Sequence, residues 1–178
     1  MSITLFSRIL GFLLISFGLV FLKLKPSMEQ TFYRWLRNDV LGVAIFLIPA
    51  AWFMFKLTQL GEADFGQYKN WLLLLFGFTF MGCCIYWRDF LIIRGLAMFT
   101  IMSIDALFKI SYMSEAVVSP AISLLFYIFI LIALYCGCYP YCIRNILPKA
   151  FSKNSRYIKY VGVFCITYGI ILLTLSTL

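Results

Sequence analysis

The sequence predicts an all-α membrane protein, a bundle of six transmembrane helices with a short interfacial amphipathic helix after the first. Two observations predict this fold class. The 178 residues are 63% hydrophobic and 12% charged, whereas soluble domains are about 45 to 50% apolar and about 25% charged. In addition, apolar runs recur along the chain, each close to the roughly 20 residues that a helix needs to cross a bilayer. We therefore treat residues 1–178 as one transmembrane domain in contact with the lipid bilayer.

The predicted spans cover approximately residues 3–22, 40–55, 70–87, 90–111, 120–139 and 157–177. The first span lacks the cleavage pattern of a signal peptide, so we expect it to be retained. Residues 71–110 would form one helix of about 60 Å, twice the hydrocarbon thickness of a bilayer. The adjacent charges Arg88 and Asp89 therefore indicate a tight hairpin between the third and fourth spans. Pro120 and Pro140 mark the start and the end of the fifth span.

Residues 27–37 are predicted to form a helix that lies in the membrane interface. Apolar residues recur there at the spacing of one helix face, and Arg34 and Arg37 fall elsewhere. The apolar face comprises Met28, Phe32, Trp35 and Leu36. We expect this helix to be a linker against the headgroups, and a docking site for a partner is the alternative.

Lysine and arginine are distributed unequally between alternate connections. Eleven lie in or beside the first, third and fifth connections, and four lie on the other side. The positive-inside rule then predicts cytoplasmic placement of those three connections and extracytoplasmic placement of both termini. A bacterial inner membrane is the default location. Because the net charge of +8 is scattered over these connections, attraction to anionic lipid explains it better than binding to nucleic acid, which we do not expect.

The first and last spans resemble each other. Residues 8–22, RILGFLLISFGLVFL, align without gaps to residues 159–173, KYVGVFCITYGIILL, with four identities. Small residues on one stripe allow helix backbones to approach closely, so both helices are predicted to pack through this face. An inverted repeat of the kind found in transporters is the alternative interpretation. The candidate packing face comprises Gly11, Ser16, Gly18, Gly162, Thr167 and Gly169.

Motifs for soluble-type catalysis are missing from the sequence. It contains no histidine, which is the commonest metal ligand and the usual proton shuttle in proteins. Its cysteines lack the spacing of a zinc site. We expect the cysteines to act as small apolar residues, with lipid modification or redox chemistry at Cys142 as the alternative. Phosphate-binding loops, nucleophile elbows and dinucleotide fingerprints are also absent. We therefore expect no cofactor, no metal and no enzymatic activity.

The second long connection carries a DFG tripeptide without the other elements of a kinase. We interpret it as a solvated turn, and recognition of a partner or of cations is the alternative. The candidate recognition residues are Glu62, Asp64, Phe65 and Tyr68.

Three charged residues inside the fourth span form the strongest candidate site. Arg94, Asp105 and Lys109 fall on one stripe of the helix. Arg94 and Asp105 are 11 residues apart, close to three helical turns, and Lys109 follows Asp105 by four residues, about one further turn. Arg94 and Lys109 can extend to opposite membrane surfaces, whereas Asp105 is short and is expected to pair with Lys109 four residues later. We expect this stripe to face other helices. It either stabilises packing, or binds protons or cations along a transport path, or pairs with a partner subunit.

The leading functional hypothesis is an accessory or assembly subunit that packs against another membrane protein. The partner is then a different membrane protein or a second copy of the chain. A small oligomeric transporter or channel using Arg94, Asp105 and Lys109 is the alternative. A membrane-embedded enzyme acting on lipids is the least favoured, because the sequence offers no cluster of polar groups at one interface.

Overall fold

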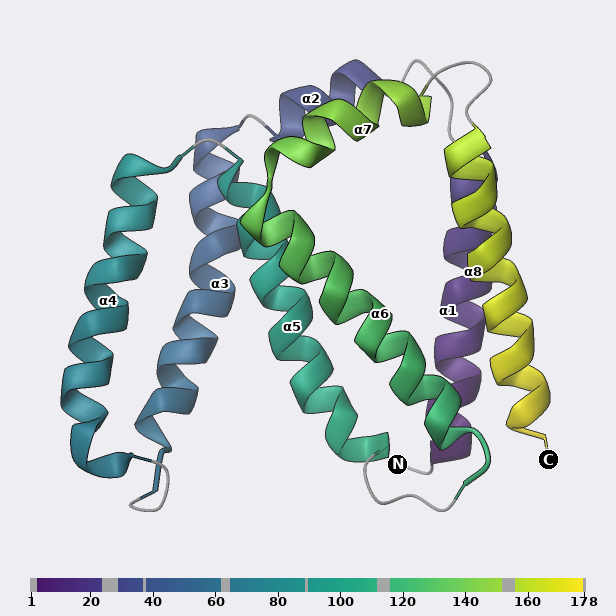
Figure 1. Cartoon of the computed structure of the whole chain (residues 1–178), viewed down its shortest axis with the longest axis horizontal. Helices are drawn as coiled ribbons and strands as arrows, with labels where there is room; N and C mark the ends of the chain where they lie inside the picture. Colours follow the sequence, from purple (N-terminus) through teal and green to yellow (C-terminus); the bar gives the residue numbers. More distant parts are fainter. Residues whose placement is uncertain are drawn as a thin grey trace.

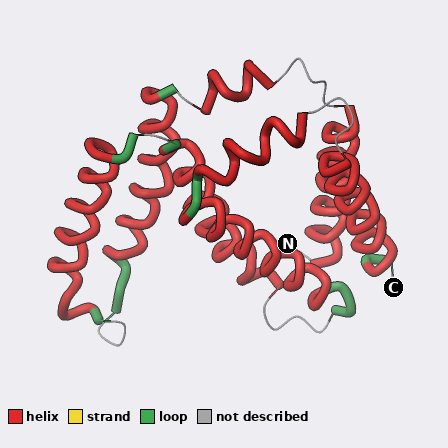
Figure 2. Tube along the Cα trace, turned by 45° about the horizontal axis from the view of Figure 1, so that its top comes forward, coloured by secondary structure: helices red, strands yellow, loops and turns green. Residues whose placement is uncertain are grey.

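The computed structural model describes residues 3–23, 29–36, 38–61, 65–88, 90–111, 116–151 and 156–177. Within these ranges the secondary structure is helical, without strands (Figure 2). Six of the described helices are long and apolar enough to cross a membrane. They are α1 (Ile3–Lys23), α3 (Asp39–Thr58), α4 (Lys69–Tyr86), α5 (Leu91–Ser111), α6 (Ser119–Cys138) and α8 (Arg156–Leu175). The chain is a multi-pass membrane protein, and the predicted all-α fold with six spans is confirmed.

The spans form a row. α4 packs on α3, α3 on α5 and α5 on α6, while α1 and α8 form an antiparallel pair beyond α6 (Figure 1). One side of the row, the lower side in Figure 1, holds the starts of α1 and α6 and the ends of α5 and α8. We call this side of the row its lower end. Two shorter helices, α2 (Glu29–Leu36) and α7 (Tyr141–Phe151), cross the opposite, upper end.

Helix α7 was not predicted from the sequence. We predicted one interfacial helix, at residues 27–37, and treated residues 140–156 as a connection between the fifth and sixth spans. The apolar residues Ile143, Ile146 and Leu147 of α7 have the three and four residue spacing of a helix face. Two prolines, Pro140 before the helix and Pro148 within it, hide this periodicity, because proline usually marks a helix boundary. The described part of the chain therefore includes two amphipathic helices, α2 and α7, on the upper side of Figure 1.

Helix boundaries follow local chemistry. The side chain of Asn38 accepts a hydrogen bond from the backbone N–H of Leu41 at 3.3 Å, which caps α3 and starts it one residue earlier than predicted. Pro120 lies in the first turn of α6, as expected. The predicted hairpin between α4 and α5 is present, but Asp89 itself is outside the described residues.

Two apolar clusters hold the row together. The larger one joins α1, α5, α6 and α8 through Phe6, Ile104, Ile122 and Leu172. The smaller one joins α3 and α5 around Phe46.

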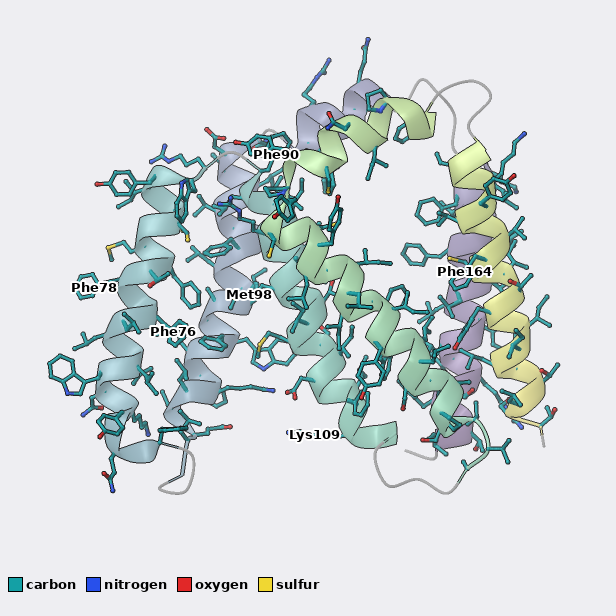
Figure 3. All side chains as sticks on the ribbon, in the orientation of Figure 1. Phe76, Phe78, Phe90, Met98, Lys109 and Phe164 are labelled. Atoms are coloured by element: carbon teal, nitrogen blue, oxygen red, sulfur yellow. The ribbon has the colours of Figure 1, made fainter. Side chains whose placement is uncertain are left out.

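Helix α4 lies at the edge of the row and contributes no fully buried residue. It packs on α3 through aromatic rings, including Phe76 and Phe53 at 4.9 Å between centroids. Figure 3 shows Phe76 on the side of α4 toward α3 and Phe78 on the opposite side. α4 therefore presents most of its surface to the membrane.

Candidate functional site

The site is built where α3 crosses α5. A Cβ atom on Gly95 would come within 2.9 Å of the Cα atom of Phe46, so this position has no room for a side chain. Small residues at such a crossing let two backbones approach closely. Beyond this contact toward the lower end, the two helices carry the polar residues that form the site.

An ion pair joins the two spans. The ammonium group of Lys56, near the end of α3, contacts carboxylate oxygen Oδ2 of Asp105 on α5. Lys56 also lies over the ring of Trp52, 5.9 Å from its centroid, and Trp52 in turn lies 6.2 Å from the ring of Phe99 on α5. The ion pair and the two rings therefore link α3 and α5 below their crossing.

The ion pair is only partly covered by the chain. The side chain of Asp105 is 54% exposed and that of Lys56 is 31% exposed. Among the described residues, the second carboxylate oxygen of Asp105 has no hydrogen-bond donor. α5 continues for six residues beyond Asp105, about 9 Å at 1.5 Å per residue, so Asp105 lies within a candidate span and not at its end.

The predicted pairing of Asp105 with Lys109 is wrong, because Lys56 from a different span takes that place. Lys109 lies exposed at the lower end of α5 (Figure 3). Arg94 lies at the upper end, with its guanidinium group 5.5 Å from the ring centroid of Trp87. Among the described residues, therefore, Asp105 is the one of the three candidates that forms an ion pair.

We predicted that the stripe of α5 that carries Arg94, Asp105 and Lys109 faces other helices. The structure shows this for only part of its length, where Met98 and Met102 lie on the same stripe. Met98 packs against the cluster of α3 and α5, and Met102 is buried. The side chain of Asp105, by contrast, is more than half exposed. The helices α3 and α5 share their apolar contacts near the crossing, which leaves the lower part of the stripe open.

The glycine face lies between α1 and α8. A Cβ atom on Gly18 would come within 2.8 Å of the carbonyl oxygen of Gly162, and one on Gly169 within 2.8 Å of that of Gly11. The four glycines therefore form two close contacts between the antiparallel helices. Isoleucine side chains cover two of these positions, Ile15 over Gly169 and Ile166 over Gly18.

Small polar residues contribute differently to this pair. Ser16 and Thr167 are exposed and donate hydrogen bonds within their own helices, to the carbonyl oxygens of Phe12 and Phe164. A buried polar contact between the helices comes from Ser7, which is fully buried and donates to the carbonyl oxygen of Leu172 at 3.2 Å. Ser7 was not among the predicted residues, because it precedes the aligned segment.

The other predicted residues are only partly within the described chain. Glu62, Asp64 and Met28 lie outside it, as does the side chain of Phe32. Phe65 and Tyr68 are exposed; Phe65 precedes the short 3-10 helix Gly66–Tyr68 that leads into α4, and Tyr68 is its last residue.

In α2, Trp35 is exposed, whereas Leu36 lines a cavity toward α5 and α6.

Within the part of the chain that the structure describes, no group of three or more cysteine, aspartate or glutamate side chains could hold a metal ion. The chain matches no family model, no curated protein and no solved structure.

Proposed function

We propose that this protein is an accessory or assembly subunit that packs against another membrane protein through the surface of α3 and α5 around Lys56 and Asp105. The observation that carries this proposal is the half-exposed carboxylate of Asp105 within a candidate membrane span. Charged side chains within spans almost always face protein or water, since exposure to lipid costs about 2.5 to 3.5 kcal/mol at the membrane centre and less near its surface. A donor from a partner helix would satisfy the remaining carboxylate oxygen and remove this cost.

A transporter would require water to reach the same carboxylate. The three cavities found among the described residues are lined almost entirely by apolar surface, and none of them has Asp105 in its lining. We therefore favour a protein partner over an ion path. The partner is a different membrane protein or a second copy of the chain, and the proposed role needs no catalytic group.

We further propose that α2 and α7 lie on the cytoplasmic side of a bacterial inner membrane and that both termini are extracytoplasmic. The excess of lysine and arginine in the connections at the end with α2 and α7 supports this orientation. In this arrangement the Lys56 and Asp105 pair lies in the outer half of the membrane.

Photo-crosslinking in native membranes tests the protein contact. A benzoylphenylalanine at position 99, whose ring lies next to Trp52, should crosslink one defined protein. The same residue at position 78, exposed on α4, is the control and should not crosslink it. Asp105→Asn should abolish the crosslink from position 99, whereas Lys109→Gln should leave it unchanged. If the Asp105→Asn protein accumulates normally and crosslinks as before, Asp105 is not part of an assembly surface.

A further inference from the structure

A wedge-shaped apolar cavity separates α6 from α8. It has a volume of about 350 Å³, within the size range of ordinary ligand sites, about 300 to 1,000 Å³. Its walls include Phe129 and Ile132 of α6 and Val161 and Phe164 of α8. Figure 3 shows Phe164 on the side of α8 toward this space. The cavity therefore lies between spans and not at the aqueous surface.

The wedge is closed at its lower end. There α6 packs against α1 and α8 through Leu14, Leu125 and Leu172 of the larger apolar cluster. The hydroxyl group of Tyr168 also donates a hydrogen bond to the carbonyl oxygen of Ala121 at 2.7 Å. A spanning helix is about 10 to 12 Å wide with its side chains and would have to continue through this contact. The wedge therefore suits a ligand that reaches only part of the way across the membrane.

The upper end of the wedge is bridged by α7, which contacts both α6 and α8 (Figure 1). A second cavity of about 270 Å³ shares Phe129 and Ile132 and extends toward α2 and α7, where Leu36 and Ile143 line it. Since the wedge has no polar surface, water would be poorly bound in it. An acyl chain would supply the missing van der Waals contacts.

The same end of the wedge is basic. α7 contains Arg144 and Lys149 without an acidic residue. Lys159 is exposed on α8 directly before the lining residues Tyr160 and Val161. Basic residues at the membrane surface attract anionic headgroups, so the charge complements a phosphate at this level.

We propose that the wedge between α6 and α8 binds an anionic glycerophospholipid. One acyl chain lies between Ile132 and Val161, and the phosphate lies at the level of α7, beside Lys159 at the start of α8. This site is separate from the surface around Lys56 and Asp105, so the two proposals stand or fall independently.

Native mass spectrometry of the full chain in mild detergent, titrated with phosphatidylglycerol, tests this site. Ile132→Trp fills the wedge and should weaken phosphatidylglycerol binding at least tenfold. Leu131→Trp is the matched control, because Leu131 is the adjacent α6 residue and is 67% exposed without lining the wedge. It should bind as the wild type does. Lys159→Gln should weaken binding of phosphatidylglycerol severalfold and leave binding of phosphatidylcholine unchanged.

A second pair of variants covers the case in which Ile132→Trp does not fold. Val161→Phe narrows the wedge from α8, and Val163→Phe, which is exposed and outside the lining, is its control. Unchanged phosphatidylglycerol binding in the folded wedge variants would overturn the proposal. Equal affinity of the wild type for phosphatidylcholine would overturn the anionic assignment. If the wedge variants instead lose a protein that remains bound to the wild type, the wedge is a groove for that protein and not a lipid site.

Discussion

Gly18 of α1 lies against Gly162 of α8, so that a Cβ atom on Gly18 would come within 2.8 Å of the carbonyl oxygen of Gly162 and one on Gly162 within 3.1 Å of that of Gly18. Gly11 and Gly169 repeat this relationship at 3.0 and 2.8 Å. Gly18 aligns with Gly169 in the sequence, and Gly11 with Gly162. Corresponding positions therefore exchange roles across the antiparallel pair, as they do in an interface with two-fold symmetry.

Replacing Gly18 with leucine should destabilise the fold by about 1 to 3 kcal/mol, because the atoms in the way include the backbone oxygen of Gly162, which cannot move aside as the side chain of Ile166 can. Gly82→Leu on α4 is the control, since a Cβ atom there would meet nothing within 4 Å. Both variants gain the same helix propensity. Thermal unfolding in one detergent should show a lower Tm for Gly18→Leu only, and equal Tm values would contradict the close contact.

Gly18→Ala and Gly162→Ala should not be additive. Each alanine pushes the same two backbones apart, so the second substitution should cost less once the first has separated them. Contacting residues typically show coupling of about 0.5 to 3 kcal/mol. A cycle with Gly18→Ala and Gly82→Ala should be additive within roughly 0.3 to 0.5 kcal/mol. Additivity in both cycles would mean that the two glycines do not face each other.

The six spans could be predicted because their length and composition are properties of each segment alone. The ion pair could not, because helical periodicity tells which residues share a face but not which helix lies opposite that face. Asp105 therefore suggested its neighbour Lys109, while its actual partner, Lys56, is 49 residues away. The signal for Lys56 was its position two residues before the end of α3, just beyond the predicted span of residues 40–55.

Lys56→Gln should destabilise the protein more than the double variant Lys56→Gln with Asp105→Asn. The single substitution leaves a carboxylate within a candidate span without its cation, whereas the double variant removes both charges. We expect a coupling on the order of 0.5 to 3 kcal/mol, measured from thermal unfolding in detergent. Lys109→Gln is the control and should change stability by about 0.5 kcal/mol or less. A double variant that is the least stable of the three would show that Lys56 and Asp105 do not act as a pair.

The orientation predicts where a reporter enzyme folds. Both termini lie at the lower end of the row, opposite to α2 and α7 (Figure 1). The excess of lysine and arginine in the connections near α2 and α7 predicts that these two helices are cytoplasmic. Alkaline phosphatase needs disulfides, which form in the periplasm and not in the cytoplasm. Fused after Thr177 it should therefore be active, and fused after Asn145 of α7 it should be inactive. A green fluorescent reporter at the same two positions should give the opposite pattern, since it folds in the cytoplasm. Activity of phosphatase only at Asn145 would reverse the orientation and place the Lys56 and Asp105 pair in the inner half of the membrane.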